Sequence, residues 1–482
     1  MKTDLIKMIN EKGNFIAGNW HKSGSGKFLE IKHKFTQEPI SRLPLASKEQ
    51  VEEAITESQK GFAQMRSWTA GKRTELLEKL HDKLAANAEA IADIIVAEAG
   101  KPKSYATTEL SRCLSTLKIA AQESLRLNGE VVPIDFANGK GKIAITKRVP
   151  VGPVLCICPF NFPLNLVLHK VAPALAVGCS VIIKPAPQAP MAALALANLI
   201  EESGYPKGTV SVLLCDIPEA EMMVKDERLA MVSFTGSDKI GWHLKTICGN
   251  KKISLELGGN GAAIVSEGAD LANAAKVLAT GSYLYAGQIC ISTQRIFVNS
   301  VDFDEFVELF TKETHKLKMG DPTDKEVIVG PVIDAANLNR IKSWVDEAVA
   351  SGAQLIFGGN IIDASHNIFE PTLLTGTRTT MKVLDDEIFG PVAVVEKVET
   401  FSEAIQRVNS SRFGLQTGVF TNDLNEIKLA FNDLEVGGVI INNAPGFRID
   451  NMPYGGVKHS GFGREGLRYA MEEMTEIRLL VF

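Results

Sequence analysis

The chain has 482 residues, 45% hydrophobic and 23% charged, so it is long enough for two or three globular domains with large cores. Its formal net charge is −5 and its basic residues form no dense cluster, which argues against a nucleic acid partner. The N-terminus lacks the apolar core of a signal peptide, and no apolar run reaches the roughly 18 residues of a membrane span. We therefore expect a cytoplasmic protein with no membrane contact.

The seven cysteines are an odd number in a long chain, which argues against a disulfide framework. Cys156 and Cys158 are separated by one residue in an alternating apolar segment, so both side chains should face the same core. No second ligand pair follows at the spacing of a zinc site. We therefore expect buried cysteines here and no metal centre.

Residues 47–125 are expected to be helical. Ser47 is followed three positions later by Gln50, which is a capping-box pattern, and leucines then recur at helical spacing. Residues 126–150 break this period. The turn residues at 138–141 lie between two short apolar segments, which predicts a hairpin.

From residue 151 onward, short apolar runs alternate with helical segments, which indicates a doubly wound α/β fold with a parallel sheet. The predicted strands are 154–158, 181–183, 210–214 and 231–234, and the predicted helices are 164–177, 190–203 and 217–226. A second α/β series begins near residue 257, with a helix at 271–283 and strands at 261–265, 295–298, 354–357 and 392–398. Residues 475–482 predict one more strand, which needs a sheet edge.

Three segments carry candidate chemistry. Cys290 ends the turn Gly287-Gln288-Ile289-Cys290, where backbone N–H groups can hold a thiolate; alone, a cysteine is more often a small buried hydrophobe. Glu256 lies between leucines and before two glycines, where desolvation suits a general base, although a strand-end salt bridge is the alternative. Asn161 lies between two aromatic residues and two prolines. This setting suits a rigid donor to an oxyanion, although an ordinary turn residue is the alternative.

In this order the three segments resemble the signature set of the aldehyde dehydrogenase superfamily, over about residues 12–482. The resemblance implies that Cys290 attacks an aldehyde while Asn161 and the Cys290 N–H hold the oxyanion. Hydride then leaves for NAD or NADP, and Glu256 activates the water that hydrolyses the thioester. Lys170 and Glu465 match family positions linked to the proton path.

The resemblance also implies the domain organisation: a Rossmann-type cofactor domain, a second α/β catalytic domain and a small β oligomerisation arm. The cofactor domain comprises residues 1–125 and 151–256, and the catalytic domain residues 257–441. Residues 442–469 form the substrate loop and return to the cofactor domain. The arm comprises 126–150 and 470–482 and implies a homo-oligomer, either a dimer or a tetramer.

Several segments match the family's cofactor site. Gly236, Ser237 and Gly241 follow a strand and open a helix, as in the family's pyrophosphate turn; a generic turn is the alternative. Lys184 matches the lysine that binds the adenosine ribose. NAD-selective members commonly carry Glu three residues later, whereas this chain has Pro187. Since proline does not repel a 2′-phosphate, the choice between NAD and NADP stays open.

The nicotinamide end of the cofactor matches a later motif. Glu387 would accept hydrogen bonds from the nicotinamide ribose, and Phe389 would pack near the nicotinamide ring. Phe160 is assigned to this site and to the substrate wall. A loop with a surface charge is the alternative for Glu387.

The segment Phe447-Arg448-Ile449-Asp450 resembles the subgroup that includes lactaldehyde and phosphonoacetaldehyde dehydrogenases. In that subgroup an arginine such as Arg448, and a second such as Arg112, can face an anionic or hydroxylated substrate. Ile289 stands where phosphonate oxidisers carry arginine, which weakens the case for a dianion. Alternatively, Arg448 pairs with Asp450 or its neighbours and only braces the loop. Phe160 and Tyr454 would form aromatic walls that suit a small apolar aldehyde equally well.

Two rival functions are weighed. A CoA-acylating enzyme must protect its thioester from water and typically lacks the general base, so Glu256 favours hydrolysis. A non-catalytic structural or binding member of the superfamily would have lost Cys290 or Asn161, and both are present. Formation of reduced cofactor with an aldehyde would separate catalysis from binding.

Overall fold

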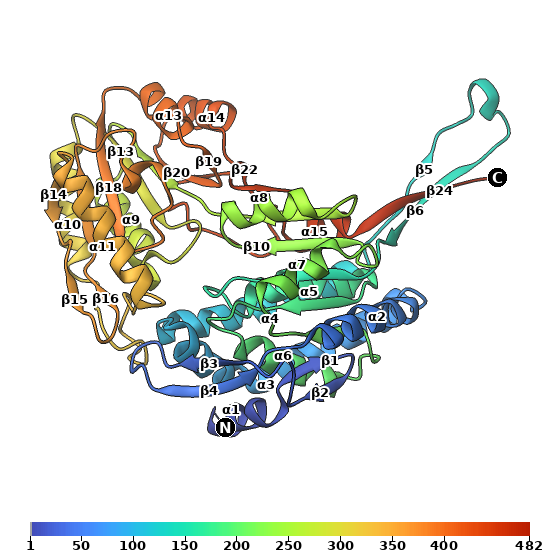
Figure 1. Cartoon of the computed structure of the whole chain (residues 1–482). Coiled ribbons are helices and arrows are strands. Elements are labelled where there is room, and N and C mark those ends of the chain that lie inside the picture. Colours follow the sequence, from blue (N-terminus) through green and yellow to red (C-terminus); the bar gives the residue numbers. More distant parts are fainter. Residues whose placement is uncertain (1) are drawn as a thin grey trace.

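The computed structural model describes residues 2–482, which form two α/β units and a small antiparallel arm (Figure 1). The first unit is built on an eight-stranded sheet in the order β2-β1-β9-β8-β7-β10-β11-β23. Its strands are β1 (Asn14–Ile16), β2 (Asn19–His21), β7 (Val154–Ile157), β8 (Val181–Lys184), β9 (Val210–Val212), β10 (Met231–Thr235), β11 (Lys252–Glu256) and β23 (Gly461–Phe462). The central strands β9-β8-β7-β10-β11 are parallel, and their order reverses direction between β7 and β10, as in a Rossmann fold.

The first sheet has a separate apolar core on each face, because side chains alternate along its strands. Val154 and Cys156 contribute to one core and Leu155 to the other. Cys158 joins Cys156 in the first core, which confirms that both cysteines face the same way. The helices on the first face are α1 (Lys2–Lys12), α3 (Ala70–Ala99), α4 (Lys103–Ser124), α5 (Asn165–Val177), α6 (Met191–Ser203) and α15 (Leu467–Glu473). Those on the second face are α2 (Lys48–Met65), α7 (Ile217–Lys225) and α8 (Asp238–Ile247).

The predicted capping box is present at the start of α2. Ser47 Oγ accepts from the Gln50 N–H at 3.4 Å, and Gln50 Oε1 accepts from the Ser47 N–H at 3.0 Å. This exchange satisfies two backbone donors that the first helical turn would otherwise leave without partners.

The second unit is built on a seven-stranded sheet in the order β14-β17-β18-β13-β12-β20-β21, in which only β14 is antiparallel. Its strands are β12 (Gly261–Val265), β13 (Thr293–Asn299), β14 (Gln354–Phe357), β17 (Thr372–Thr375), β18 (Val392–Val398), β20 (Gln416–Phe420) and β21 (Gly438–Ile441). One face packs on α9 (Leu271–Tyr283), α10 (Phe303–Thr314), α11 (Ala335–Ala350) and α12 (Lys382–Asp385). The other face packs on α13 (Phe401–Asn409) and α14 (Leu424–Asp433).

Three short strand pairs and two single-turn 3₁₀ helices complete these units and the arm. They are β3 (Phe28–Lys32) with β4 (Pro39–Pro44), β15 (Ile361–Asp363) with β16 (Ile368–Phe369), β19 (Phe413–Gly414) with β22 (Val457–Lys458), η1 (Ala137–Gly139) and η2 (Leu284–Gly287). None of the helices within residues 2–482 combines the length and apolar character needed to cross a membrane.

The arm confirms the predicted hairpin and C-terminal strand, and shows that they pair with each other. Strand β6 (Ala144–Pro150) lies between β5 (Val131–Val132) and β24 (Thr475–Val481), with both pairings antiparallel. The arm projects away from both units, and the C-terminus lies at its tip (Figure 1). Its apolar side chains are largely exposed, with 71% of Phe136 and 64% of Ile477 open to solvent.

Candidate active site

The candidate residues from both units converge where the ends of their strands meet. Asn161 follows β7, and Gly236 and Ser237 follow β10, so these residues flank the point where the strand order of the first sheet reverses. Ligands bind at this crevice in open α/β sheets. Glu256 ends β11 of the same sheet, and Cys290 comes three residues before β13 of the second sheet.

Two glycines allow the units to meet closely. A Cβ atom on Gly259 would lie 2.4 Å from the Cys290 carbonyl oxygen, and one on Gly258 would lie 2.2 Å from Glu387 Oε2. Any side chain at either position would displace the cysteine loop or the glutamate. The Gly-Gly pair after Glu256 is therefore required by the close approach of the backbones.

Cys290 is the one partly exposed cysteine; the other six are buried. Its Sγ lies 3.2 Å from the Tyr454 hydroxyl, and among the described residues its backbone N–H has no acceptor. Burial raises the pKa of the Cys290 thiol to about 11, and the hydrogen bond with Tyr454 offsets only part of this rise. Burial therefore opposes the thiolate that the turn was expected to hold, and favours the protonated thiol in the free enzyme.

Glu256 is 3% exposed, and neither of its carboxylate oxygens has a hydrogen-bond partner among residues 2–482. Burial, followed by the negative charge of Glu465, raises the pKa of Glu256 well above its usual value. The alternative of a strand-end salt bridge is therefore wrong. The substrate loop passes close over this carboxylate at Gly455, where an added Cβ would lie 2.9 Å from Glu256 Oε1.

Asn161 is held against the cysteine loop. Its Nδ2 donates to the Gln288 carbonyl at 2.9 Å, two residues before Cys290, and the side chain is 3% exposed. One N–H of the amide is used in this bond and the second is left for another acceptor. The Asn161 amide and the backbone N–H of Cys290 thus belong to two loops that are joined directly.

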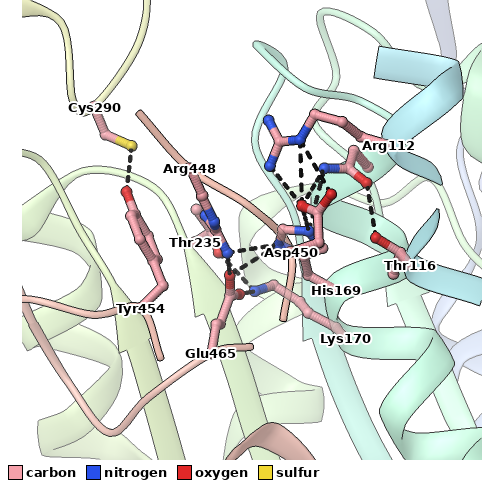
Figure 2. A network of polar contacts seen from close by, with 11 residues as sticks. Arg112, Thr116, His169, Lys170, Thr235, Cys290, Arg448, Asp450, Tyr454 and Glu465 are labelled. Carbon is pink, nitrogen blue, oxygen red and sulfur yellow. Dashed lines mark hydrogen bonds and ion pairs between the residues drawn. The ribbon is translucent and has the colours of Figure 1, made fainter. Parts of the chain in front are cut away.

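Behind these groups, Lys170 and Glu465 form a buried ion pair (Figure 2). Lys170 Nζ donates to Glu465 Oε1 at 2.7 Å and to Thr235 Oγ1 at 2.6 Å. Burial alone would lower the pKa of Lys170, but the charge of Glu465 outweighs it and raises that pKa. The two residues that the sequence linked to the proton path therefore contact each other.

The ion pair continues into a network that reaches Arg112 (Figure 2). His169 bridges Glu465 Oε2 at 3.2 Å and Asp450 Oδ1 at 2.8 Å, and Arg112 donates to Asp450 at 2.6 Å. Burial would raise the pKa of Asp450, but its bonds to His169 and Arg112 outweigh burial and hold that pKa low. Sequence reasoning did not assign His169 to the site, and its adjacency to Lys170 was the available signal. It considered Asp450 only as a partner of Arg448.

The two arginines do not share one partner. Arg448 binds Glu465 at 3.1 Å rather than Asp450, and its guanidinium lies 3.5 Å from the centre of the Tyr454 ring. Its Nε is buried and has no hydrogen-bond partner. Arg112 is the residue that pairs with Asp450. Tyr454, expected as an aromatic wall, contacts both Arg448 and the Cys290 thiol.

The pyrophosphate turn has the features that an anion needs. Ser237 caps α8 without a side-chain hydrogen bond, so the first N–H groups of this helix stay without acceptors in the described chain. A Cβ on Gly236 would lie 2.6 Å from the Phe234 ring, and one on Gly241 would lie 2.2 Å from Leu257. These glycines bring the helix and strand close together.

Two further predicted cofactor residues lie at the end of β8 and beyond it. The ammonium of Lys184 makes no hydrogen bond or ion pair with any described residue, and burial lowers its pKa. Pro187 is exposed, so an acidic side chain at that position would face solvent beside the lysine segment. Neither position is occupied by a competing contact.

Glu387 and Phe389 come from the second unit and face the first. Glu387 Oε1 accepts from the Gly259 N–H at 3.0 Å, and burial raises the pKa of Glu387 to about 8. Phe389 has a left-handed backbone with φ of 45°, and its ring meets Phe160 edge to face at 5.9 Å. Glu387 thus contacts the loop that follows Glu256, and the ring contact of Phe389 with Phe160 joins the two units beside the point where the strand order reverses.

The fold and this crevice define a two-unit α/β oxidoreductase with a Rossmann-type sheet. The family model "Aldehyde dehydrogenase family" matches residues 20–480. The chain therefore belongs to the aldehyde dehydrogenase family, which confirms the resemblance, the fold class and the enzyme class inferred from the sequence.

Individual relatives match over nearly their whole length. The chain is 41% identical to the 3-sulfolactaldehyde dehydrogenase of Priestia aryabhattai, over 99% of both chains. It is 38% identical to aldehyde dehydrogenase 21 of Physcomitrella patens, solved in complex with the reaction product succinate, with a TM-score of 0.94 over 98% of both chains. It is 36% identical to a glyceraldehyde-3-phosphate dehydrogenase of Methanocaldococcus jannaschii complexed with NADP, with a TM-score of 0.91 over 95% of this chain and 99% of the other.

Proposed function

We propose that the protein oxidises an aldehyde to a carboxylic acid through a covalent intermediate on Cys290, with hydrolysis by water activated at Glu256. The observation that carries this proposal is Glu256 itself, a buried carboxylate whose two oxygens have no partner. An unsatisfied buried carboxylate destabilises a fold, so its presence in the interior points to a function, and its raised pKa suits a general base.

In the first half of the reaction, Cys290 Sγ forms a bond with the carbonyl carbon and the π electrons move to the carbonyl oxygen. The free N–H of the Asn161 amide and the backbone N–H of Cys290 stabilise the resulting oxyanion. The thiol proton passes to Glu256, whose charge acts on Cys290. The bound NAD or NADP supplies the hydride acceptor, and a thioester on Cys290 results.

In the second half, Glu256 first passes the thiol proton on towards the Lys170–Glu465 pair and is then free to remove a proton from water. The water oxygen attacks the thioester carbon, the carbon–sulfur bond breaks, and the acid is released while the Cys290 sulfur takes up a proton. Each turnover leaves protons near Glu256 that must move away. The charges of Glu465 and Lys170 act on Glu256, so this buried pair is suited to the proton path.

The cofactor is NAD or NADP in this proposal. The open N-terminus of α8 would hold the pyrophosphate, Lys184 the adenosine ribose and Glu387 the nicotinamide ribose. The Phe160–Phe389 contact borders the place where the nicotinamide would lie. Pro187 leaves room for a 2′-phosphate, in agreement with the relative that is complexed with NADP.

For the substrate we propose a small aldehyde that carries an anionic group. The names of the three relatives include a sulfonate, a dicarboxylate product and a phosphate. The network holds three cations, Arg112, Lys170 and Arg448, against two carboxylates, Asp450 and Glu465. An anionic substituent would balance the charge, and the unpartnered Nε–H of Arg448 is available to bind it.

We also propose the organisation that the family resemblance implies: a cofactor domain, a catalytic domain and an arm through which subunits form a homo-oligomer. Residues 126–150 and 470–482 form the arm, whose exposed apolar surface suits an interface between subunits. The two sheets would correspond to the cofactor and catalytic domains, and β23 supports the return of residues 442–469 to the first sheet.

The test measures reduced cofactor formed from 3-sulfolactaldehyde, succinic semialdehyde and uncharged propanal, each with NAD and with NADP. We expect turnover with the anionic aldehydes at lower KM than with propanal, and none with Cys290→Ala, which should still bind the dinucleotide. Turnover by Cys290→Ala within about tenfold of the unmodified enzyme would refute the covalent mechanism, since loss of a nucleophile costs far more.

A further inference from the structure

Two buried charges that the mechanism does not use lie behind the Asn161 loop. Lys101 and Glu109 form an ion pair, and both side chains are 0% exposed. Glu109 Oε1 accepts from the backbone N–H groups of Leu164 and Asn165, each at 3.0 Å. Since α5 begins at Asn165, Glu109 caps the helix that immediately follows the Asn161 loop.

The Lys101 ammonium lies among three aromatic rings. Its Nζ is 3.6 Å from the centre of the Phe162 ring, 5.1 Å from that of Tyr285 and 5.2 Å from that of Tyr105. Phe162 directly follows Asn161, and Tyr285 begins the turn that leads to Cys290. A single cation thus contacts the loop of the oxyanion donor and the loop of the nucleophile, in a buried place where cation–π attraction is strong.

The second loop is fixed to the same region by further contacts. The Tyr285 hydroxyl donates to the Ala99 carbonyl at 2.8 Å, two residues before Lys101. Tyr285 and Ala286 have left-handed backbones, with φ of 54° and 52°, which cost energy and persist only where neighbours hold them. The Asn161–Gln288 bond joins the loops on the opposite side.

We propose that Lys101 and Glu109 are positioning residues that set the placement of the Asn161 amide relative to the Cys290 thiol. Neither residue contacts the thiol. Glu109 anchors the end of the Asn161 loop, and Lys101 holds Phe162 against Tyr285, so both act on the addition step through Asn161. This inference rests on the proposed function, in which Asn161 and Cys290 react with the aldehyde.

Loss of the ammonium would change this placement in two ways. The three rings would lose the cation between them, and the Glu109 carboxylate would be left as an unpaired buried charge. Displacement of a catalytic group by about 1 Å can cost on the order of 100-fold in rate. The effect should therefore appear in the chemical step and not in binding of the cofactor.

The experiment measures the burst of reduced cofactor in single-turnover mixing of the full-length enzyme. Lys101→Met should slow the burst by roughly 10–100-fold, with the Kd of the cofactor changed less than about twofold. Lys101→Arg keeps the cation and should recover part of the rate. Should Lys101→Met not fold, Glu109→Gln, which keeps the side-chain size and an acceptor oxygen, is measured in its place.

A double-mutant cycle with Asn161→Ala measures the coupling between the two residues in the burst rate. A purely structural role of Lys101 would give no such coupling. If Lys101 acts through Asn161, Lys101→Met should slow the burst by less than about twofold in the Asn161→Ala background, because coupled residues are not additive. An additive loss in that background, or an unchanged burst in the single variant, would overturn the inference.

Glu98 offers a matched control. It is a buried carboxylate that caps α6 in the same manner, accepting from Met191 N at 2.6 Å and Ala192 N at 2.9 Å. Glu98→Gln should lower Tm as Glu109→Gln does, yet leave the burst rate per folded molecule unchanged. A full burst in Cys290→Ala or Asn161→Ala would instead show that the proposed function is wrong, whatever Lys101 does.

Discussion

Glu256 has the clearest test at the scale of single residues. If it is the base for both half-reactions, Glu256→Gln should release at most one equivalent of reduced cofactor per site, more slowly than the unmodified enzyme because the thiol proton loses its acceptor, and then stall. General-base assistance is worth roughly 10²–10⁴-fold, so steady-state turnover should fall by that factor. Rapid mixing followed by steady-state assay of the same sample measures both phases. An undiminished steady state would assign the activation of water to another group.

The raised pKa of Glu256 also predicts the direction in which the rate of thioester hydrolysis changes with pH. Only the ionised carboxylate can accept a proton, and a raised pKa means that ionisation occurs at higher pH than for an exposed glutamate. Hydrolysis of the thioester should therefore accelerate as pH increases and slow as pH falls, over a range higher than that of an exposed glutamate. The rate after the burst, followed from about pH 6 to 9, measures this, with Glu256→Gln as the control that should lose the dependence.

Cofactor choice depends on a single exposed position. Pro187 predicts measurable activity with NADP, and Pro187→Glu should shift the kcat/KM preference towards NAD by about 10–100-fold, because a carboxylate repels the 2′-phosphate. Pro187→Ala controls for loss of the proline ring and should leave the preference unchanged. Absence of NADP activity in the unmodified enzyme would contradict the role given to this segment.

At the scale of elements, the arm has the most direct test. Strand β24 pairs with β6 along one edge only, and Ile477, Leu479 and Leu480 are each more than half exposed. Deletion of residues 477–482 should yield monomers or insoluble protein, since β6 then loses its longest partner. Size-exclusion chromatography of the soluble fraction measures the outcome.

A pair of point variants separates loss of the interface from loss of the strand. Leu480→Asp adds a charge on the arm and should weaken assembly, whereas Val301→Asp adds one at a more exposed apolar position of the second unit and should not. Equal assembly of the truncated and intact chains would remove the arm from the interface.

The elements that could be predicted are those with a local signal. The helix predicted at 271–283 matches the bounds of α9, and the strand predicted at 392–398 matches those of β18. Strands β1 to β4 were not predicted, because each has only 3 to 6 residues and depends on distant partners. Strand β20 was missed as well, since Gln416–Phe420 has no clear apolar run and is stabilised by β12 and β21.

The same limit applies to the site. The motifs around Asn161, Glu256 and Cys290 indicated chemistry because their residue types are unusual, and their placement in one crevice agrees with that reading. The contact between Arg112 and Asp450 spans 338 residues, and no local pattern reports such a pairing. The raised pKa of the Cys290 thiol was also beyond sequence reasoning, because burial causes it.

At the scale of the whole molecule, the exposed arm predicts assembly of the intact protein. An apolar sheet with a free edge is unfavourable in water, and a two-fold arrangement would cover it in both subunits at once. Light scattering at micromolar concentration should give at least twice the chain mass of 52.2 kDa. A mass equal to one chain would refute the assembly proposed for the arm.

The distribution of thiols has a consequence for oxidative damage. Six cysteines are buried, and the apolar cluster around Cys290 contains no second cysteine among the described residues. Peroxide therefore has one accessible target, and the sulfenic acid formed there has no neighbouring thiol to capture it as a disulfide. Because thiolate is the reactive species and burial raises the pKa of Cys290, we expect peroxide to oxidise the resting enzyme slowly. Once oxidised, it depends on small thiols from outside the chain for recovery.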